Sequence, residues 1–114
     1  MTDVVLILTT APAGDLAEQL ARTLLEEGLA ACINIGAPMV ALYRWHGAIE
    51  RDEEQALVIK STRDRIESVR TRIGALHPYE LPEFLVLDVG SGSDAYLDWV
   101  RAETRSRPDP PVPE

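Results

Sequence analysis

The chain has 114 residues, of which 46% are hydrophobic, and its formal net charge is −8. This length allows one domain with a hydrophobic core but not two, and the composition is that of a folded protein rather than a disordered one. The negative charge argues against nucleic acid as a partner and suits neutral, cationic or metal-ion ligands, although solubility alone would also explain it.

A single cysteine, Cys32, excludes an internal disulfide and a cysteine-based zinc site. Its position in an apolar run favours a buried, unreactive thiol. The apolar run near the N-terminus is far shorter than the ~20 residues that a membrane span needs, and no basic segment precedes it. We therefore expect no signal peptide, no membrane contact and a cytoplasmic location.

Residues 4–10 form a continuous apolar run rich in β-branched side chains, and residues 11–14 interrupt it. Such a run predicts a strand covered on both faces. A helix follows, with Asp15 as its N-cap, Glu18 as its capping-box partner and Gly28 as the left-handed residue that closes it. One apolar stripe at helical spacing is predicted to face the core: Leu16, Ala17, Leu20, Ala21 and Leu24.

Residues 31–62 predict a long β-hairpin that folds back at residues 45–47. Ordinary strands stop near ~5–6 residues, so these arms would project beyond the sheet of their own subunit. Residues 36–38 include a proline and predict a kink in the first arm. Alternation places Tyr43 and Trp45 on the same face. The second arm is polar near the turn and apolar further on, so one end should be exposed and the other buried.

The second half of the chain predicts a helix, a short strand and another helix. Ser61 and Asp64 offer a cap for the first of these helices, which ends at residues 77–78 because the residue before proline resists helical geometry. Its core-facing stripe is Ile66, Val69, Ile73 and Leu76.

Residues 84–87 predict a fourth strand, and Ser93 is expected to cap the last helix, which carries Tyr96, Leu97 and Val100. We assign residues 1–104 to one domain and residues 105–114 to a proline-rich flexible tail.

The predicted order is strand, helix, strand, strand, helix, strand, helix. Its first six elements define an α+β fold of the ferredoxin-like βαββαβ type, in which both helices cover one face of an antiparallel sheet. The first strand is nevertheless apolar on both faces. A further layer must cover the second face, and a partner subunit is the simplest source of it.

Five sequence blocks resemble the CutA family of divalent-cation tolerance proteins, in that family's order and spacing, over roughly residues 3–102. They lie at residues 29–35, 43–49, 54–60, 77–83 and 96–99, and the most specific is His-Pro-Tyr-Glu-Leu-Pro-Glu at 77–83. The resemblance implies a ferredoxin-like subunit that forms a tight homotrimer through the long hairpin, similar to PII-type signalling proteins. It also implies a role in tolerance of copper and other divalent metals, with no established reaction.

His77 is the candidate metal ligand, because imidazole suits copper or zinc. The resemblance implies a copper site that uses a cysteine where this chain has Leu8 and a second histidine where it has Leu76. Only His77 carries over, so we expect weak or indirect binding of a divalent metal. A hydrogen-bonded residue at a helix end is the alternative interpretation of His77. The acidic residues near His46 could also attract cations loosely, or could simply be a solvated strand end.

A small-ligand cleft is the alternative function, that of a PII-like trimeric sensor of an organic molecule. Aromatic walls with a few convergent polar groups are typical of binding clefts, and aromatic side chains are also enriched at subunit interfaces. A cleft between subunits would satisfy both interpretations. The candidate ligand-binding residues are Tyr43, Trp45, Lys60, His77, Tyr79, Glu80 and Glu83.

Catalysis has weaker support. His77 with Glu80 or Glu83 could form an acid–base pair. The sequence has no nucleophile elbow and no glycine-rich phosphate loop, and residues 90–92 read only as a turn. We predict that the protein is not an enzyme.

Overall fold

The computed structural model describes residues 2–105, so the predicted tail lies outside the described residues except for Arg105. The strands are β1 (Val4–Pro12), β2 (Cys32–Ile35), β3 (Met39–Trp45), β4 (Ala48–Thr62) and β5 (Leu85–Asp88). The helices are α1 (Leu16–Glu26), α2 (Ile66–Leu76) and α3 (Asp94–Glu103), and a 3-10 turn (Arg63–Arg65) precedes α2. This order confirms the predicted α+β, ferredoxin-like arrangement.

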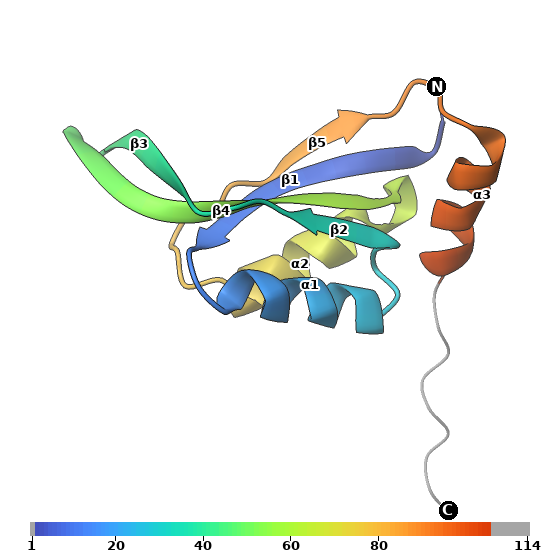
Figure 1. Ribbon diagram of the computed structural model, residues 1–114, viewed down its shortest axis with the longest axis horizontal. Helices are drawn as coiled ribbons and strands as arrows, with labels where there is room; N and C mark the ends of the chain where they lie inside the picture. Colours follow the sequence, from blue (N-terminus) through green and yellow to red (C-terminus); the bar gives the residue numbers. More distant parts are fainter. Residues whose placement is uncertain (1, 106–114) are drawn as a thin grey trace, which may run out of the picture.

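One antiparallel sheet contains all five strands, in the order β2-β4-β1-β5, and β3 pairs with β4 beyond β2. Helices α1 and α2 lie side by side on one face of it (Figure 1). The core between the sheet and these helices consists mainly of aliphatic side chains with less than 2% exposure, since burying them is the main source of folding free energy: Val5, Ile7, Leu20, Leu24, Leu57, Ile59, Val69 and Ile73.

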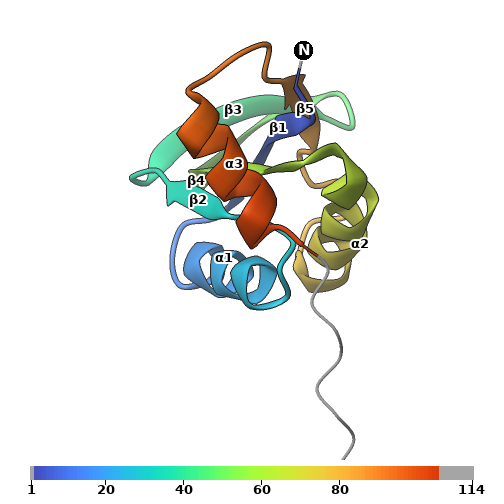
Figure 2. The ribbon, with the colours of Figure 1, turned by 90° about the vertical axis from the view of Figure 1, so that its right-hand side faces the viewer.

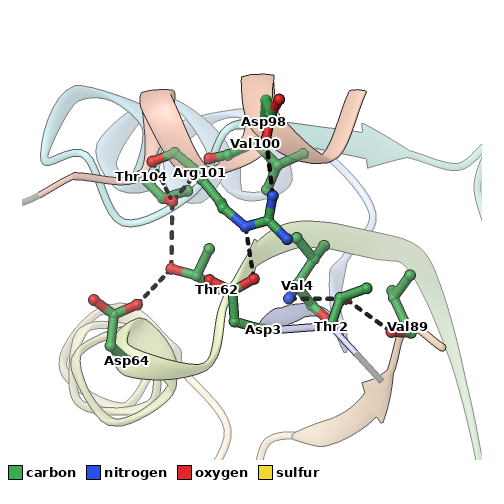
Figure 3. A network of polar contacts seen from close by, with 10 residues as sticks. All are labelled: Thr2, Asp3, Val4, Thr62, Asp64, Val89, Asp98, Val100, Arg101 and Thr104. Carbon is green, nitrogen blue, oxygen red and sulfur yellow. Dashed lines mark hydrogen bonds and ion pairs between the residues drawn. The ribbon is translucent and has the colours of Figure 1, made fainter. Parts of the chain in front are cut away.

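Helix α3 packs across one end of the opposite sheet face (Figures 1 and 2). Val4 contacts Leu97 and Val100 there in a second, smaller core cluster. Polar contacts attach the same helix and its C-cap to the sheet (Figure 3). Arg101 donates to the carboxylate of Asp3, just before β1, at 2.7 Å, and the hydroxyl oxygens of Thr104 and Thr62 in β4 lie 3.3 Å apart. The face that α3 leaves uncovered continues toward the hairpin.

The hairpin follows the sequence prediction closely. Residues 36–38 separate β2 from β3, and both pair with the single long strand β4. A two-residue turn joins β3 to β4, with φ of 49° at His46 and 80° at Gly47. Two positive φ values are typical of a type I′ turn, whose twist matches that of the flanking strands. Gly28, which follows the C-cap residue Glu27 of α1, likewise has a positive φ of 71°, as predicted.

One predicted cap is confirmed in position only, and another is wrong. Asp15 occupies the N-cap position of α1, but its backbone is already helical and its side chain makes no capping hydrogen bond; Glu18 pairs instead with Arg22 one turn later. Ser61 does not cap the following helix, because its hydroxyl is buried and donates to the carbonyl of Leu29 at 2.6 Å. The predicted cap of α3 is confirmed, since Ser93 accepts a hydrogen bond from the backbone N–H of Tyr96 at 3.3 Å.

Three boundary or burial predictions also need correction. Strand β1 does not break at residue 11 but continues through Pro12, which pairs with Glu54 at the end of the ladder, where proline is tolerated. Strand β5 lies one residue later than predicted, a difference typical of strand ends. Cys32 is only partly buried, because in β2 it is paired with Lys60 on the face away from α1 and α2.

Candidate functional site

A groove of about 840 Å³ lies between the hairpin and the segment that connects α2 to β5. One wall consists of residues 41–45 of β3, and the other of residues 78–85. Thr10 and Glu54 lie between the walls. Five predicted ligand-binding residues meet in this groove: Tyr43, Trp45, Tyr79, Glu80 and Glu83.

The hairpin wall exists because β3 and the first half of β4 extend beyond the helices (Figure 1). The register pairs Tyr43 with Glu50 and Trp45 with Ala48, which places both aromatic rings on one face, as predicted. The hydroxyl of Tyr43 donates a hydrogen bond to the carboxylate of Asp52. This bond raises the pKa of Tyr43 to about 12, because it would be lost on deprotonation and a phenolate would face a carboxylate.

The second wall repeats this phenol–carboxylate pairing. Tyr79 is partly buried, and it lies near the carboxylate of Glu54. Burial first, and the neighbouring carboxylate second, raise the pKa of Tyr79 to about 12, because both disfavour a phenolate. Glu54 is itself only 8% exposed and lines the same groove. The groove therefore contains a protonated phenol beside a largely buried carboxylate.

His77 lies behind this wall rather than in the lining, and it is 8% exposed. Its Nε2 donates to the carbonyl oxygen of Thr10 at 2.7 Å, and its Nδ1 accepts from the backbone N–H of Tyr79 at 3.1 Å. This pattern requires the neutral tautomer with the proton on Nε2. The imidazole thus fixes the start of the 78–85 wall against β1.

The residues around His77 do not fit a metal centre as they are placed. A metal ion at either ring nitrogen would replace one of the two hydrogen bonds, and no group of three or more His, Cys, Asp or Glu side chains that could hold a metal occurs within residues 2–105. Leu8 and Leu76 add no ligand atoms.

Lys60 is separated from the groove. It pairs with Leu6 and Cys32 near the far end of β4, and its Nζ lies 5.6 Å from the centre of the Tyr96 ring. Ten residues of β4 separate it from Glu50, which corresponds to about 33 Å at ~3.3 Å per residue. Lys60 therefore cannot contact a ligand in the same groove of the same chain.

Sequence reasoning missed Glu54 as a groove residue, although it identified the acidic stretch that contains it. The available signal was the alternation along β4, which places Glu50, Asp52 and Glu54 on the face of Tyr43. Leu81, which is 71% exposed, was also missed, because nothing local distinguishes an exposed leucine that lines a groove from one that contacts solvent.

The fold and the groove define a class: a ferredoxin-like domain with an overhanging β-hairpin, an aromatic and acidic groove at its base and one incompletely covered sheet face. No helix within residues 2–105 is long and apolar enough to cross a membrane. The family model described as "CutA1 divalent ion tolerance protein" matches residues 5–103. The chain belongs to this family, as the sequence blocks had indicated.

Relatives and solved structures agree with this assignment. The chain is 41% identical to a divalent-cation tolerance protein CutA of Thermus thermophilus over 104 residues, which cover 91% of this chain and 99% of the relative. It is 40% identical to a CutA of Pectobacterium atrosepticum, with 92% and 96% covered. The crystal structure of CutA from Xylella fastidiosa superimposes with a TM-score of 0.88 at 40% identity, covering 91% of this chain and all of that one.

Proposed function

We propose that this divalent-cation tolerance protein works as a homotrimer whose subunits pack through the long hairpin and the uncovered sheet face. The observation that carries the proposal is the apolar character of that face. Leu85 and Leu87 of β5 are 53% and 49% exposed, and the register places them opposite Leu8 and Leu6 on the same face. Exposed apolar surface of this kind is typical of a protein–protein interface.

The edges of the sheet favour a ring over a two-fold dimer. Within residues 2–105, β5 forms one edge, whereas β2 and β3 form the other. An unpaired strand edge can pair with another chain. Contacts between two different surfaces are heterologous, and they close into a ring when the rotation allows it. A ring of three would also place each hairpin against a neighbouring subunit.

Light scattering at micromolar concentration tests the assembly. We expect a particle of three times the 12.6 kDa chain mass. Leu87→Glu should reduce the mass, because it places a charge on the proposed interface, whereas Ser68→Glu on the exposed surface of α2 should leave the mass unchanged. A folded wild-type particle of 12.6 kDa would contradict the proposal.

We further propose that divalent metals, copper included, bind weakly. His77 would have to exchange a hydrogen bond for a metal bond, which supports low affinity. Calorimetric titration with Cu²⁺, before and after His77→Ala, tests this: a shallow isotherm that His77→Ala weakens further is expected. Tight binding would contradict the proposal.

A second candidate function is recognition of a small organic ligand, favoured by the volume and aromatic walls of the groove. A metabolite that raises Tm of the wild type but not of Tyr43→Ala would support it. Cytoplasmic location and the absence of catalysis stay predictions. Turnover that disappears in His77→Ala or Glu83→Ala would contradict the second of them.

A further inference from the structure

We propose that the groove binds a proline-rich peptide and that its occupant is the C-terminal segment, residues 105–114, of a second copy of this chain. The inference rests on the assembly proposed above and assigns a ligand class to the groove. The matched family region ends at residue 103, so the segment lies outside the part of the chain that defines the family.

The groove has the chemistry that recognises polyproline II helices. Such peptides bind between flat aromatic side chains, which contact the proline rings. Here Tyr43 and Trp45 lie on one wall and Tyr79 on the other. Glu80 and Glu83 add exposed carboxylates to the second wall, where a cationic side chain of the peptide could pair.

The C-terminal sequence supplies the complementary pattern. It reads RSRPDPPVPE, in which Arg107, Pro110 and Pro113 recur every third residue. A polyproline II helix has three residues per turn, so these three side chains would share one face of it. The two prolines would contact the aromatic rings while the guanidinium of Arg107 faces Glu80 or Glu83.

Reach excludes the hairpin wall of the chain's own groove as the contact of Pro113. Thr104 is held beside Thr62 at the end of β4, whereas the hairpin wall pairs with residues 48–52. Ten residues of β4 therefore separate Thr62 from this wall, or about 33 Å at ~3.3 Å per residue. Eight residue steps, the separation of Arg105 from Pro113 in the sequence, would span only about 25 Å in a polyproline II conformation at ~3.1 Å per residue. Helix α3 and the hairpin lie at opposite ends of the molecule (Figure 1).

The test is a titration followed by NMR. The acceptor is the full chain carrying Pro110→Ala and Pro113→Ala, so that its own segment does not compete, and the probe is a synthetic peptide of residues 105–114. We expect saturable shifts of the backbone amides of residues 41–45 and 79–85. The same amides should already differ between the wild type and the acceptor, since the wild-type segment occupies the groove.

Matched variants complete the experiment. In the acceptor, Tyr43→Ala should weaken peptide binding about tenfold or more, as expected for an interfacial aromatic anchor. Tyr96→Ala, which removes an exposed aromatic ring of α3 outside the groove, should leave binding unchanged. A peptide with alanine in place of both prolines should not bind. No shifts, or equal shifts with the two peptides, would overturn the inference.

Light scattering of the same samples separates this inference from the proposed assembly. If the protein is a trimer but does not bind the peptide, the inference is overturned and the proposed assembly is not. A monomeric acceptor and wild type overturn the assembly, and with it the second copy as the occupant.

Discussion

The imidazole of His77 lies 2.7 Å from the carbonyl oxygen of Thr10 and so attaches the end of α2 to β1. The other ring nitrogen, Nδ1, accepts a hydrogen bond from the backbone N–H of Tyr79. One side chain thus satisfies two backbone groups, one on β1 and one in the 78–85 wall of the groove. The same geometry explains why a histidine at this helix end has a structural role whether or not a metal is present.

His77→Ala should lower the free energy of unfolding by about 2–4 kcal/mol, because it leaves a buried carbonyl and an N–H without partners. Urea denaturation at one fixed protein concentration measures this. Glu80→Ala, an exposed neighbour, should change the value by less than about 0.5 kcal/mol. A His77→Ala protein as stable as the wild type would show that water or a rearranged loop replaces both bonds.

Ser61→Ala should also destabilise the protein, by about 1–3 kcal/mol, since the partly buried carbonyl of Leu29 would lose its donor. Ser68→Ala on the exposed surface of α2 is the matched control and should stay within about 0.5 kcal/mol of the wild type. Equal effects of the two substitutions in thermal unfolding would contradict the assigned hydrogen bond.

Stability should fall as the pH rises from 10 toward 12. The pKa of both Tyr43 and Tyr79 is raised to about 12 in the folded protein, against 10.0 for an unperturbed phenol. The folded state therefore holds these protons more tightly than the unfolded state, and the stabilisation is complete below pH 10 and is lost through pH 12.

Absorbance at 295 nm, which follows phenolate formation, measures this titration. Tyr43→Phe and Tyr79→Phe should each remove one phenol that ionises near pH 12. Ionisation of both groups near pH 10 in the folded protein would refute the phenol–carboxylate pairs.

Two glycine-to-alanine substitutions should change the free energy of unfolding in opposite directions. Gly47→Ala should cost about 1–2 kcal/mol, because the turn requires φ of 80° there, although a Cβ would meet no atom within 4 Å. Gly74→Ala in α2 also meets no atom within 4 Å but needs no unusual φ, so it should stabilise the protein by about 0.5–1 kcal/mol. Calorimetric Tm values of the two variants on the same side of the wild type would contradict the turn geometry.

The sequence alone determined the order of the elements, the amphipathic stripe of α1, the kink at residues 36–38 and the left-handed conformation of Gly28. The stripe of α2 was predicted except at its end, where Leu76 is 37% exposed. Each of these depends on neighbours within a few residues, so periodicity, proline and glycine are sufficient to reveal it. The family resemblance added the fold from blocks of sequence, and the comparisons confirmed it.

Only the tertiary structure decided how the candidate site is divided. It placed Tyr79 near Glu54 and Lys60 at the other end of β4, and it engaged both nitrogens of His77 in backbone hydrogen bonds. It also turned the expected cap residue Ser61 into a buried donor. These relationships depend on strand register and on partners distant in the chain, and no local pattern specifies which distant group a polar side chain will meet.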